Sequence, residues 1–208
     1  MNYFFSFIIG LLIGSFPTAY IILKQFRNID ITQNGSSNVG ALNSYKVSKS
    51  KKLGIVVFVI DFLKGVASVV IVKFLLGNEF PILMIALIGA VFGHCFSFWI
   101  KFKGGRGLAT AAGGALIISI PILGIWIFLW LISYAFRRNI HFANFSATLL
   151  STALGFSIGD VMNKYTTTPA SSELEFSILL LLLLSIILVK HFQPIKEYIS
   201  SNLKTSGN

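Results

Sequence analysis

The chain has 208 residues, of which 55% are hydrophobic and only 12% charged, and its mean hydropathy is +0.81. Soluble globular domains carry about 25% charged residues, so most of this chain must face something other than water. A net charge of +10 could indicate nucleic-acid binding, but the basic residues fall in short clusters between long apolar runs, which excludes a basic face on a soluble fold. We therefore expect an integral membrane protein that binds no nucleic acid. The single cysteine, Cys95, excludes a multi-cysteine metal site, and we predict neither a metal nor a cofactor.

Six apolar stretches follow one another, and roughly 20 apolar residues are needed for a helix to cross a bilayer. They are residues 4–23, 53–76, 81–100, 108–134, 142–162 and 176–189. The first lacks the basic start and cleavage site of a signal peptide, so we expect it to stay as a helix. The fourth is long for one helix and is interrupted by Pro121 and Gly124.

Charge placement decides whether residues 108–134 form one helix or two. As one helix, they would put Arg137 and Arg138 on the side opposite to Lys103 and Arg106. As two short helices, they leave Lys164 as the one basic loop residue outside, which the positive-inside rule favours. The sequence thus predicts a single all-α integral membrane domain over residues 1–208. It would have about seven transmembrane helices, an outside N-terminus and a cytoplasmic C-terminus. The short helix after Arg106 should be partly buried among its neighbours.

The first cytoplasmic loop, residues 35–46, combines glycine, neutral hydrogen-bond donors and a final lysine. Glycines let backbone N–H groups approach an anion, and serine and asparagine side chains add donors. The candidate phosphate ligands are Gly35, Ser36, Asn38, Gly40, Asn43 and Lys46. No Gly-Lys-Ser/Thr closes a Walker A loop. On residue types alone, a phosphate cradle and an ordinary polar turn are equally good interpretations.

The second cytoplasmic loop, residues 102–110, leads into a helix. Lys103 and Arg106 flank a glycine pair, Gly104 and Gly105, at a helix N-terminus, where backbone N–H groups favour an anion. A simple membrane anchor explains the two cations but not three glycines in four residues. Two such loops on one membrane face favour phosphate binding, with Thr110 in the first turn of the helix.

Three further positions place polar groups in or beside apolar stretches. Asp61 and Lys64 are three residues apart, on one helical face, where mutual neutralisation is the simpler interpretation and catalysis the other. His94 and His191 would lie near the membrane surface, either as plain interfacial histidines or as functional ones. His191 is the better candidate, because a cytoplasmic active site would lie at that depth.

The chain has neither His-x-x-x-x-Asp nor Gly-x-Ser-x-Gly, the motifs that activate a nucleophile in many acyl-transfer enzymes. Any acyl transfer would therefore need a donor with a good leaving group.

The motifs at 14–20, 35–43, 61–65, 93–94 and 102–110 stand in the order and spacing of one family. The chain resembles the bacterial acyl-phosphate:glycerol-3-phosphate acyltransferases over nearly its whole length. The resemblance implies a seven-helix enzyme of phospholipid synthesis in the cell membrane, with its active site facing the cytoplasm. Such an enzyme moves a fatty acyl group from acyl phosphate to the sn-1 hydroxyl of glycerol 3-phosphate, giving lysophosphatidate.

The chain departs from the family pattern in all the loop motifs. Lys46 stands where arginine is usual, and Arg106 where lysine is usual, which keeps charge but changes donor geometry. After the fifth helix, Arg-Tyr-Val-Ser-Leu-Ala-Ser becomes residues 138–144, with Asn144 in place of the last serine. The C-terminal His-Arg-x-Asn-Ile keeps His191 but has Pro194 at the asparagine position, and no Gly-x-Glu follows.

These observations predict an acyltransferase whose partners are acyl phosphate, glycerol 3-phosphate and membrane lipid. The resemblance implies Ser36, Lys103, Arg106 and His191 as catalytic residues, with His191 positioning the acceptor. One alternative is a diverged paralogue with another acceptor or little activity. An anion transporter is the alternative from another class, but the polar groups gather at one face instead of the midplane.

Overall fold

The computed structural model describes residues 1–205, with side chains described up to residue 201, and every regular element in that range is a helix. The chain divides into two compact units, Met1–Ile118 and Ser119–Asn208. Helices suit a bilayer because each satisfies its backbone hydrogen bonds within its own segment.

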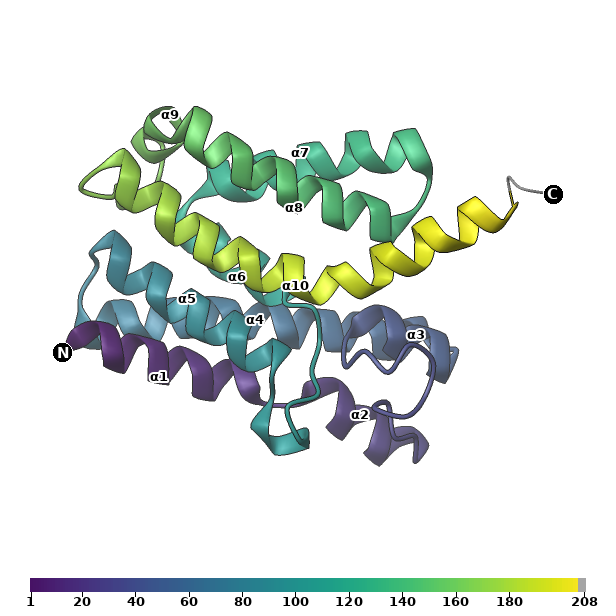
Figure 1. The fold of residues 1–208 in the computed structure, drawn as a ribbon. Coiled ribbons are helices and arrows are strands. Elements are labelled where there is room, and N and C mark those ends of the chain that lie inside the picture. Colours follow the sequence, from purple (N-terminus) through teal and green to yellow (C-terminus); the bar gives the residue numbers. More distant parts are fainter. Residues whose placement is uncertain (206–208) are drawn as a thin grey trace. The chain divides into compact units, whose positions relative to one another are not determined.

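The first unit holds the N-terminal helices and both predicted phosphate loops (Figure 1). Its elements are α1 (Asn2–Ser15), α2 (Thr18–Arg27), α3 (Ala41–Ser48), α4 (Lys51–Leu76), α5 (Phe80–Cys95), a 3₁₀ turn (Phe98–Ile100) and α6 (Leu108–Ile118). Helix α1 packs mainly against α5, and α4 against α6. Six of the eleven α6 residues are buried, which confirms the prediction for this short helix.

Small residues allow these helix pairs to approach closely. A Cβ atom at Gly10 or Gly14 of α1 would overlap the carbonyl oxygens of Ala86 or Ala90 in α5. A Cβ at Gly65 of α4 would likewise overlap the carbonyl oxygen of Thr110 in α6. Such contacts are typical of membrane helices, whose association depends on close packing because lipid is as apolar as the helices themselves.

The sequence predicts one helix over the first apolar stretch, but the structure divides it into α1 and α2. Pro17 lacks an N–H group and restricts the residue before it, so Phe16 is extended (φ −57°, ψ 119°) and separates α1 from α2. The break leaves the carbonyl oxygen of Phe16 available to a side chain from another helix.

Residues 108–134 form two helices, as the charge pattern predicted. The break lies at Ser119, just before Pro121, and Ser119 has an extended backbone (φ −157°). Its hydroxyl accepts a hydrogen bond from the Ile122 N–H at 3.5 Å and caps the second helix.

The second unit consists of α7 (Ile120–Arg137), α8 (Ile140–Ser157), α9 (Gly159–Lys164) and α10 (Glu173–Thr205). Helix α8 packs against both α7 and α10. The stretch 142–162, expected to be one span, is divided at Ile158 into α8 and the short α9. The side chain of Asn163 closes the following loop through two hydrogen bonds with the Ala170 backbone.

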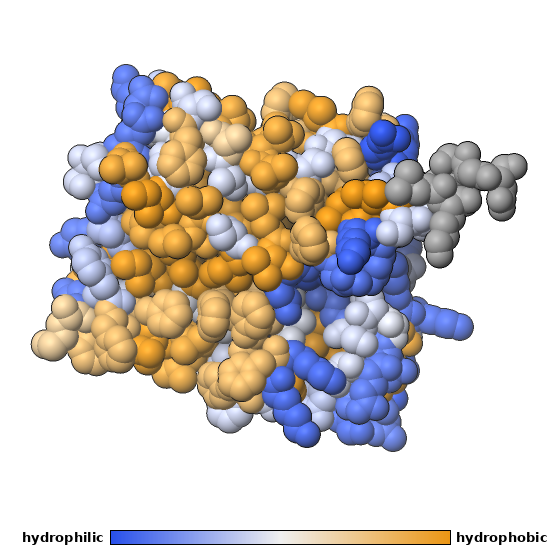
Figure 2. Space-filling view, in the orientation of Figure 1, coloured by the Kyte–Doolittle hydropathy of each residue, from blue (hydrophilic) through white to orange (hydrophobic). Residues whose placement is uncertain are grey.

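Five segments in the described residues are long and apolar enough to cross a membrane. They are Asn2–Arg27, Lys51–Leu76, Phe80–Ile100, Ile120–Arg137 and Glu173–Ser201. In the first unit, the surface is hydrophobic over α1 and becomes hydrophilic over α2 and α3 (Figure 2). An integral membrane protein is thus supported, while the count of seven and the orientation stay predictions.

We expect Gly14→Ala to destabilise the protein by about 1–3 kcal/mol, because the new methyl group would overlap the Ala90 backbone. The midpoint of thermal unfolding in detergent should fall. Gly124→Ala is the matched control, since a Cβ there meets no atom within 4 Å. Equal midpoints for the two variants would contradict the close α1–α5 contact.

Candidate active site

The first predicted phosphate loop is folded around the buried side chain of Asn43 in α3. Its Oδ1 accepts a hydrogen bond from the Ser36 N–H at 3.1 Å, and its Nδ2 donates to the carbonyl oxygens of Asn34 and Asn38, each at 3.0 Å. Gly35 has φ +62°, and a Cβ there would overlap Asn43 Oδ1. Asn43 therefore gives the loop its shape, and the Ser36 side chain remains exposed.

The second predicted loop rests on the end of α5. The Gly105 N–H donates to the His94 carbonyl oxygen at 3.0 Å. A Cβ at Gly104 would overlap that same oxygen, and a Cβ at Gly105 would overlap the His94 ring. Gly107 has φ +82°, a conformation that favours glycine. These contacts explain the three glycines, which a membrane anchor alone did not.

The two loops lie side by side in the first unit. The Val39 N–H, in the first loop, donates to the carbonyl oxygen of Gly104, in the second, at 3.2 Å. Lys46 and Lys103 are exposed, and Arg106 is half-buried. The structure thus brings together two segments about 65 positions apart in sequence, each rich in the donors that suit an anion.

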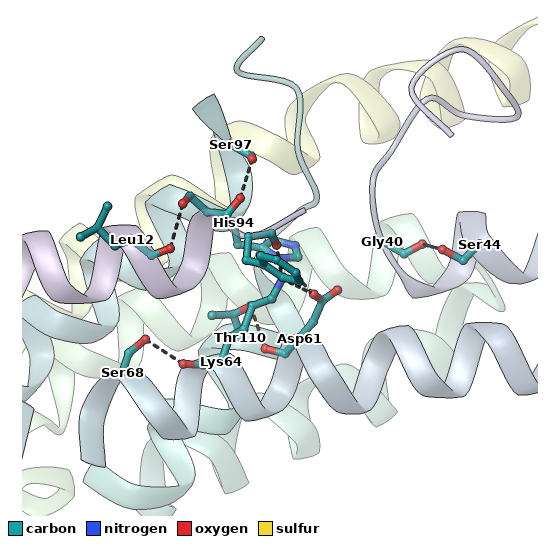
Figure 3. Close-up of polar contacts among 11 residues, drawn as sticks. Leu12, Gly40, Ser44, Asp61, Lys64, Ser68, His94, Ser97 and Thr110 are labelled. Carbon is teal, nitrogen blue, oxygen red and sulfur yellow. Dashed lines mark hydrogen bonds and ion pairs between the residues drawn. The ribbon is translucent and has the colours of Figure 1, made fainter. Parts of the chain in front are cut away.

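A buried ion pair, Asp61 with Lys64, lies close to the second loop (Figure 3). Lys64 Nζ is 2.8 Å from Asp61 Oδ1, and the two residues are 6% and 2% exposed. Lys64 Nζ also donates to the Phe16 carbonyl oxygen at 2.5 Å, at the break between α1 and α2. His94 Nδ1 lies 3.7 Å from Asp61 Oδ1. The pairing of Asp61 with Lys64, predicted from their spacing, is confirmed, and a catalytic role for either residue stays untested.

Thr110 belongs to the same network. Its hydroxyl donates to the Asp61 carbonyl oxygen at 3.0 Å and is fully buried. The sequence suggested Thr110 as a phosphate ligand, but in this structure its hydroxyl ties the start of α6 to α4.

Thr18 lies in the motif at residues 14–20 but was not predicted as a site residue, and Ser97 lies outside every motif named from the sequence. Both line a small cavity together with Asp61, Lys64 and His94. The Ser97 hydroxyl donates to the Ser15 carbonyl oxygen at 2.5 Å. Thr18 Oγ1 is buried and has no hydrogen-bond partner among the described residues. For Thr18 the available signals were this motif and the preceding proline, which marks a break where backbone and side-chain groups are freed.

One carboxylate lies outside the membrane segments beside these loops. The hydrogen bond from the Thr32 hydroxyl, 2.7 Å long, is the main cause that lowers the pKa of Asp30, and the positive charges of Lys24 and Lys103 lower it further. Asp30 is therefore ionised at neutral pH, and it holds the turn that leads into the first loop.

His191 belongs to the second unit, where it is fully buried between α10 and α8. Its Nδ1 is 2.9 Å from the Ile187 carbonyl oxygen, and its Nε2 is 3.3 Å from Asn144 Nδ2. The ring is therefore packed among helices, and its depth in the membrane stays a prediction.

Replacing Asn43 with aspartate should loosen the first loop, because a carboxylate cannot donate to the Asn34 and Asn38 carbonyl groups. We expect backbone hydrogen exchange over residues 35–42 to accelerate roughly tenfold. Gln33→Glu makes the same chemical change at an exposed position and should have no such effect. Unchanged exchange in Asn43→Asp would show that the amide does not hold the loop.

Removing only one member of the buried pair should cost more stability than removing both. Lys64→Met leaves the Asp61 carboxylate buried without its partner and should cost about 3–5 kcal/mol. The double variant Asp61→Asn/Lys64→Met removes both charges and should recover part of that loss. Thermal unfolding in detergent measures both. A double variant less stable than Lys64→Met would contradict the pairing.

The glycerol-3-phosphate acyltransferase family model matches residues 4–201. Glycerol-3-phosphate acyltransferase 2 of Moorella thermoacetica is 38% identical over 72% of this chain and 75% of its own length. A glycerol-3-phosphate acyltransferase of Campylobacter concisus is 34% identical over 77% of this chain and 82% of its own.

A crystal structure of PlsY, an integral membrane glycerol 3-phosphate acyltransferase in its glycerol 3-phosphate form, has the same fold. The TM-score is 0.79 at 27% identity, and the match covers 97% of this chain and 94% of that one. Together with the glycine-rich loops and the buried pair, these matches show that the chain belongs to the glycerol-3-phosphate acyltransferase family.

Proposed function

We propose that this membrane acyltransferase transfers a fatty acyl group from acyl phosphate to the sn-1 hydroxyl of glycerol 3-phosphate, giving lysophosphatidate for phospholipid synthesis. The observation that carries the proposal is the Val39–Gly104 hydrogen bond, which joins two donor-rich loops. Both substrates carry a phosphate group, so two adjacent anion-binding loops suit the reaction. The names of the family and of its relatives, which specify glycerol 3-phosphate, support the acceptor.

The first loop binds one phosphate through its backbone and exposed polar groups. Ser36, Asn38 and Lys46 supply side-chain donors, and the N–H groups at the start of α3, after Gly40, add partial positive charge. Asn43 contributes indirectly, by holding the Ser36 N–H in place.

The second loop binds the other phosphate and stabilises charge during the reaction. Lys103 and Arg106 supply positive charge. Gly104 and Gly105, predicted from the sequence as phosphate ligands, contribute by letting the loop pack on the end of α5, because the Gly105 N–H already donates to the His94 carbonyl oxygen. Thr110 contributes through its bond to Asp61, which fixes the start of α6. His191 orients the acceptor in this proposal, as the family pattern implies.

The chemistry needs no protein nucleophile, because acyl phosphate is already activated. The acceptor oxygen attacks the acyl carbonyl carbon, an ester C–O bond forms, and the C–O bond to phosphate breaks. A substrate phosphate takes the hydroxyl proton, and inorganic phosphate leaves. Positive charges fixed in the loops stabilise the developing negative charge in the transition state.

For the membrane orientation we propose that α6 and α8 join the five long apolar segments as spans, giving about seven in a single membrane domain. The N-terminus then lies outside, the C-terminus lies in the cytoplasm, and both loops face the cytoplasm of a bacterial cell. The basic residues of these loops support that orientation through the positive-inside rule.

An assay of the purified protein with palmitoyl phosphate and glycerol 3-phosphate tests this function. We expect lysophosphatidate to form, and Ser36→Ala and Arg106→Ala to lower kcat/KM by roughly 100-fold, the usual cost of one oriented donor. Lys52→Ala, an exposed cation at the start of α4, is the control and should retain activity. Product with a different acceptor only would overturn the acceptor and keep the chemistry. Equal losses in all three variants would contradict specific roles for the loops.

A further inference from the structure

We propose that Asn144 is the positioning residue of His191 in this chain and replaces the asparagine that the family pattern places at position 194. The inference rests on the proposed function for its kinetic test, but its geometry stands by itself. Asn144 comes from α8 and His191 from α10, and both are buried in the second unit.

Trp130 fixes the orientation of the Asn144 amide. The indole N–H can only donate, and its Nε1 lies 2.6 Å from Asn144 Oδ1. The amide oxygen must therefore face Trp130, and the amide NH₂ faces His191 at 3.3 Å. An inverted amide would place its NH₂ against the indole N–H, two donors in contact.

The amide in turn fixes the tautomer of His191. Because an NH₂ group faces Nε2, this nitrogen must accept and carries no proton. Nδ1 then carries the proton and donates to the Ile187 carbonyl oxygen at 2.9 Å. Trp130, Asn144 and His191 thus hold a neutral imidazole in one orientation. A proton on Nε2 would break either the amide–imidazole contact or the Trp130 bond.

Pro194 explains why this chain needs an amide from another helix. Positions 191 and 194 are three residues apart in α10 and share its buried face. An asparagine at 194 would place an amide on the same face of α10 as His191, whereas proline has no side-chain donor. The second departure from the family pattern, Asn144 in place of serine, supplies the missing amide. The two departures therefore compensate for each other.

Three variants test this compensation in the full-length enzyme. Asn144→Ser restores the family residue on α8 and should lower kcat/KM roughly fivefold to tenfold, the value of one buried hydrogen bond. Pro194→Asn in addition should restore most of that loss. Thr148→Val is the control on the same helix. Thr148 Oγ1 accepts from Trp126 Nε1 at 3.0 Å and donates to the Asn144 backbone carbonyl oxygen at 2.7 Å, so this variant removes a tryptophan bond and a backbone bond but leaves the Asn144 amide and its contact with His191 in place. It should keep near wild-type kcat/KM.

The ¹⁵N spectrum of histidine-labelled protein gives a second measurement that does not depend on turnover. His191→Gln identifies the resonances. In the wild-type protein we expect a neutral ring protonated at Nδ1, and in Asn144→Ser a mixture of tautomers, while Thr148→Val should match the wild type.

An unchanged His191 spectrum in Asn144→Ser would overturn the proposal, and so would activity losses equal to those of Thr148→Val. A wild-type protein that forms no lysophosphatidate but shows the expected spectra would refute the proposed function and leave the positioning of His191 intact.

Discussion

The buried ion pair between Asp61 and Lys64 is the constraint around which the first unit is built. Two charges inside an apolar bundle cost several kcal/mol each unless they are paired and hydrogen-bonded. Here the pair has contacts with two other segments, at Phe16 and His94. Phe16 offers a carbonyl group freed by Pro17, and Thr110 bonds to the Asp61 backbone. The pair thereby ties the α1–α2 break to α4, and the bond from Thr110 to the Asp61 backbone ties α6 to the same turn of α4.

That constraint extends to the loops through His94. Its ring lies beside Asp61, and its backbone and ring together form the surface on which Gly104 and Gly105 rest. Glycine has the same role here as in the helix contacts, where the absence of a Cβ lets backbone approach backbone. A loop held this closely presents its N–H groups in fixed directions, and fixed donors stabilise a transition state better than mobile ones.

In the second unit, buried polar groups that carry no formal charge are hydrogen-bonded to one another. Asn144 and Thr148 of α8 face Trp130 and Trp126 of α7, and Asn144 also contacts His191 of α10. Each of these buried donors has an acceptor, which satisfies the requirement for polar groups in an apolar interior. The Trp130 indole can only donate a hydrogen bond, so it fixes the orientation of the Asn144 amide, which in turn fixes that of the His191 ring. In the proposed reaction no protein nucleophile takes part, so the rate would depend on orientation and electrostatics.

The sequence by itself determined the membrane class, the family, the apolar stretches and the two loops with their glycines and cations. It also identified the Asp61–Lys64 pair and the break near Pro121, because residue spacing along one helix and proline geometry are local properties. Only the tertiary structure decided which distant groups meet. Helix packing decides that Lys64 bonds to the Phe16 carbonyl oxygen and that Gly105 packs on the His94 ring. It also decides that Asn43 bonds within the first loop and that Asn144 contacts His191. Packing is set by many contacts between residues far apart in sequence, and no single motif encodes it.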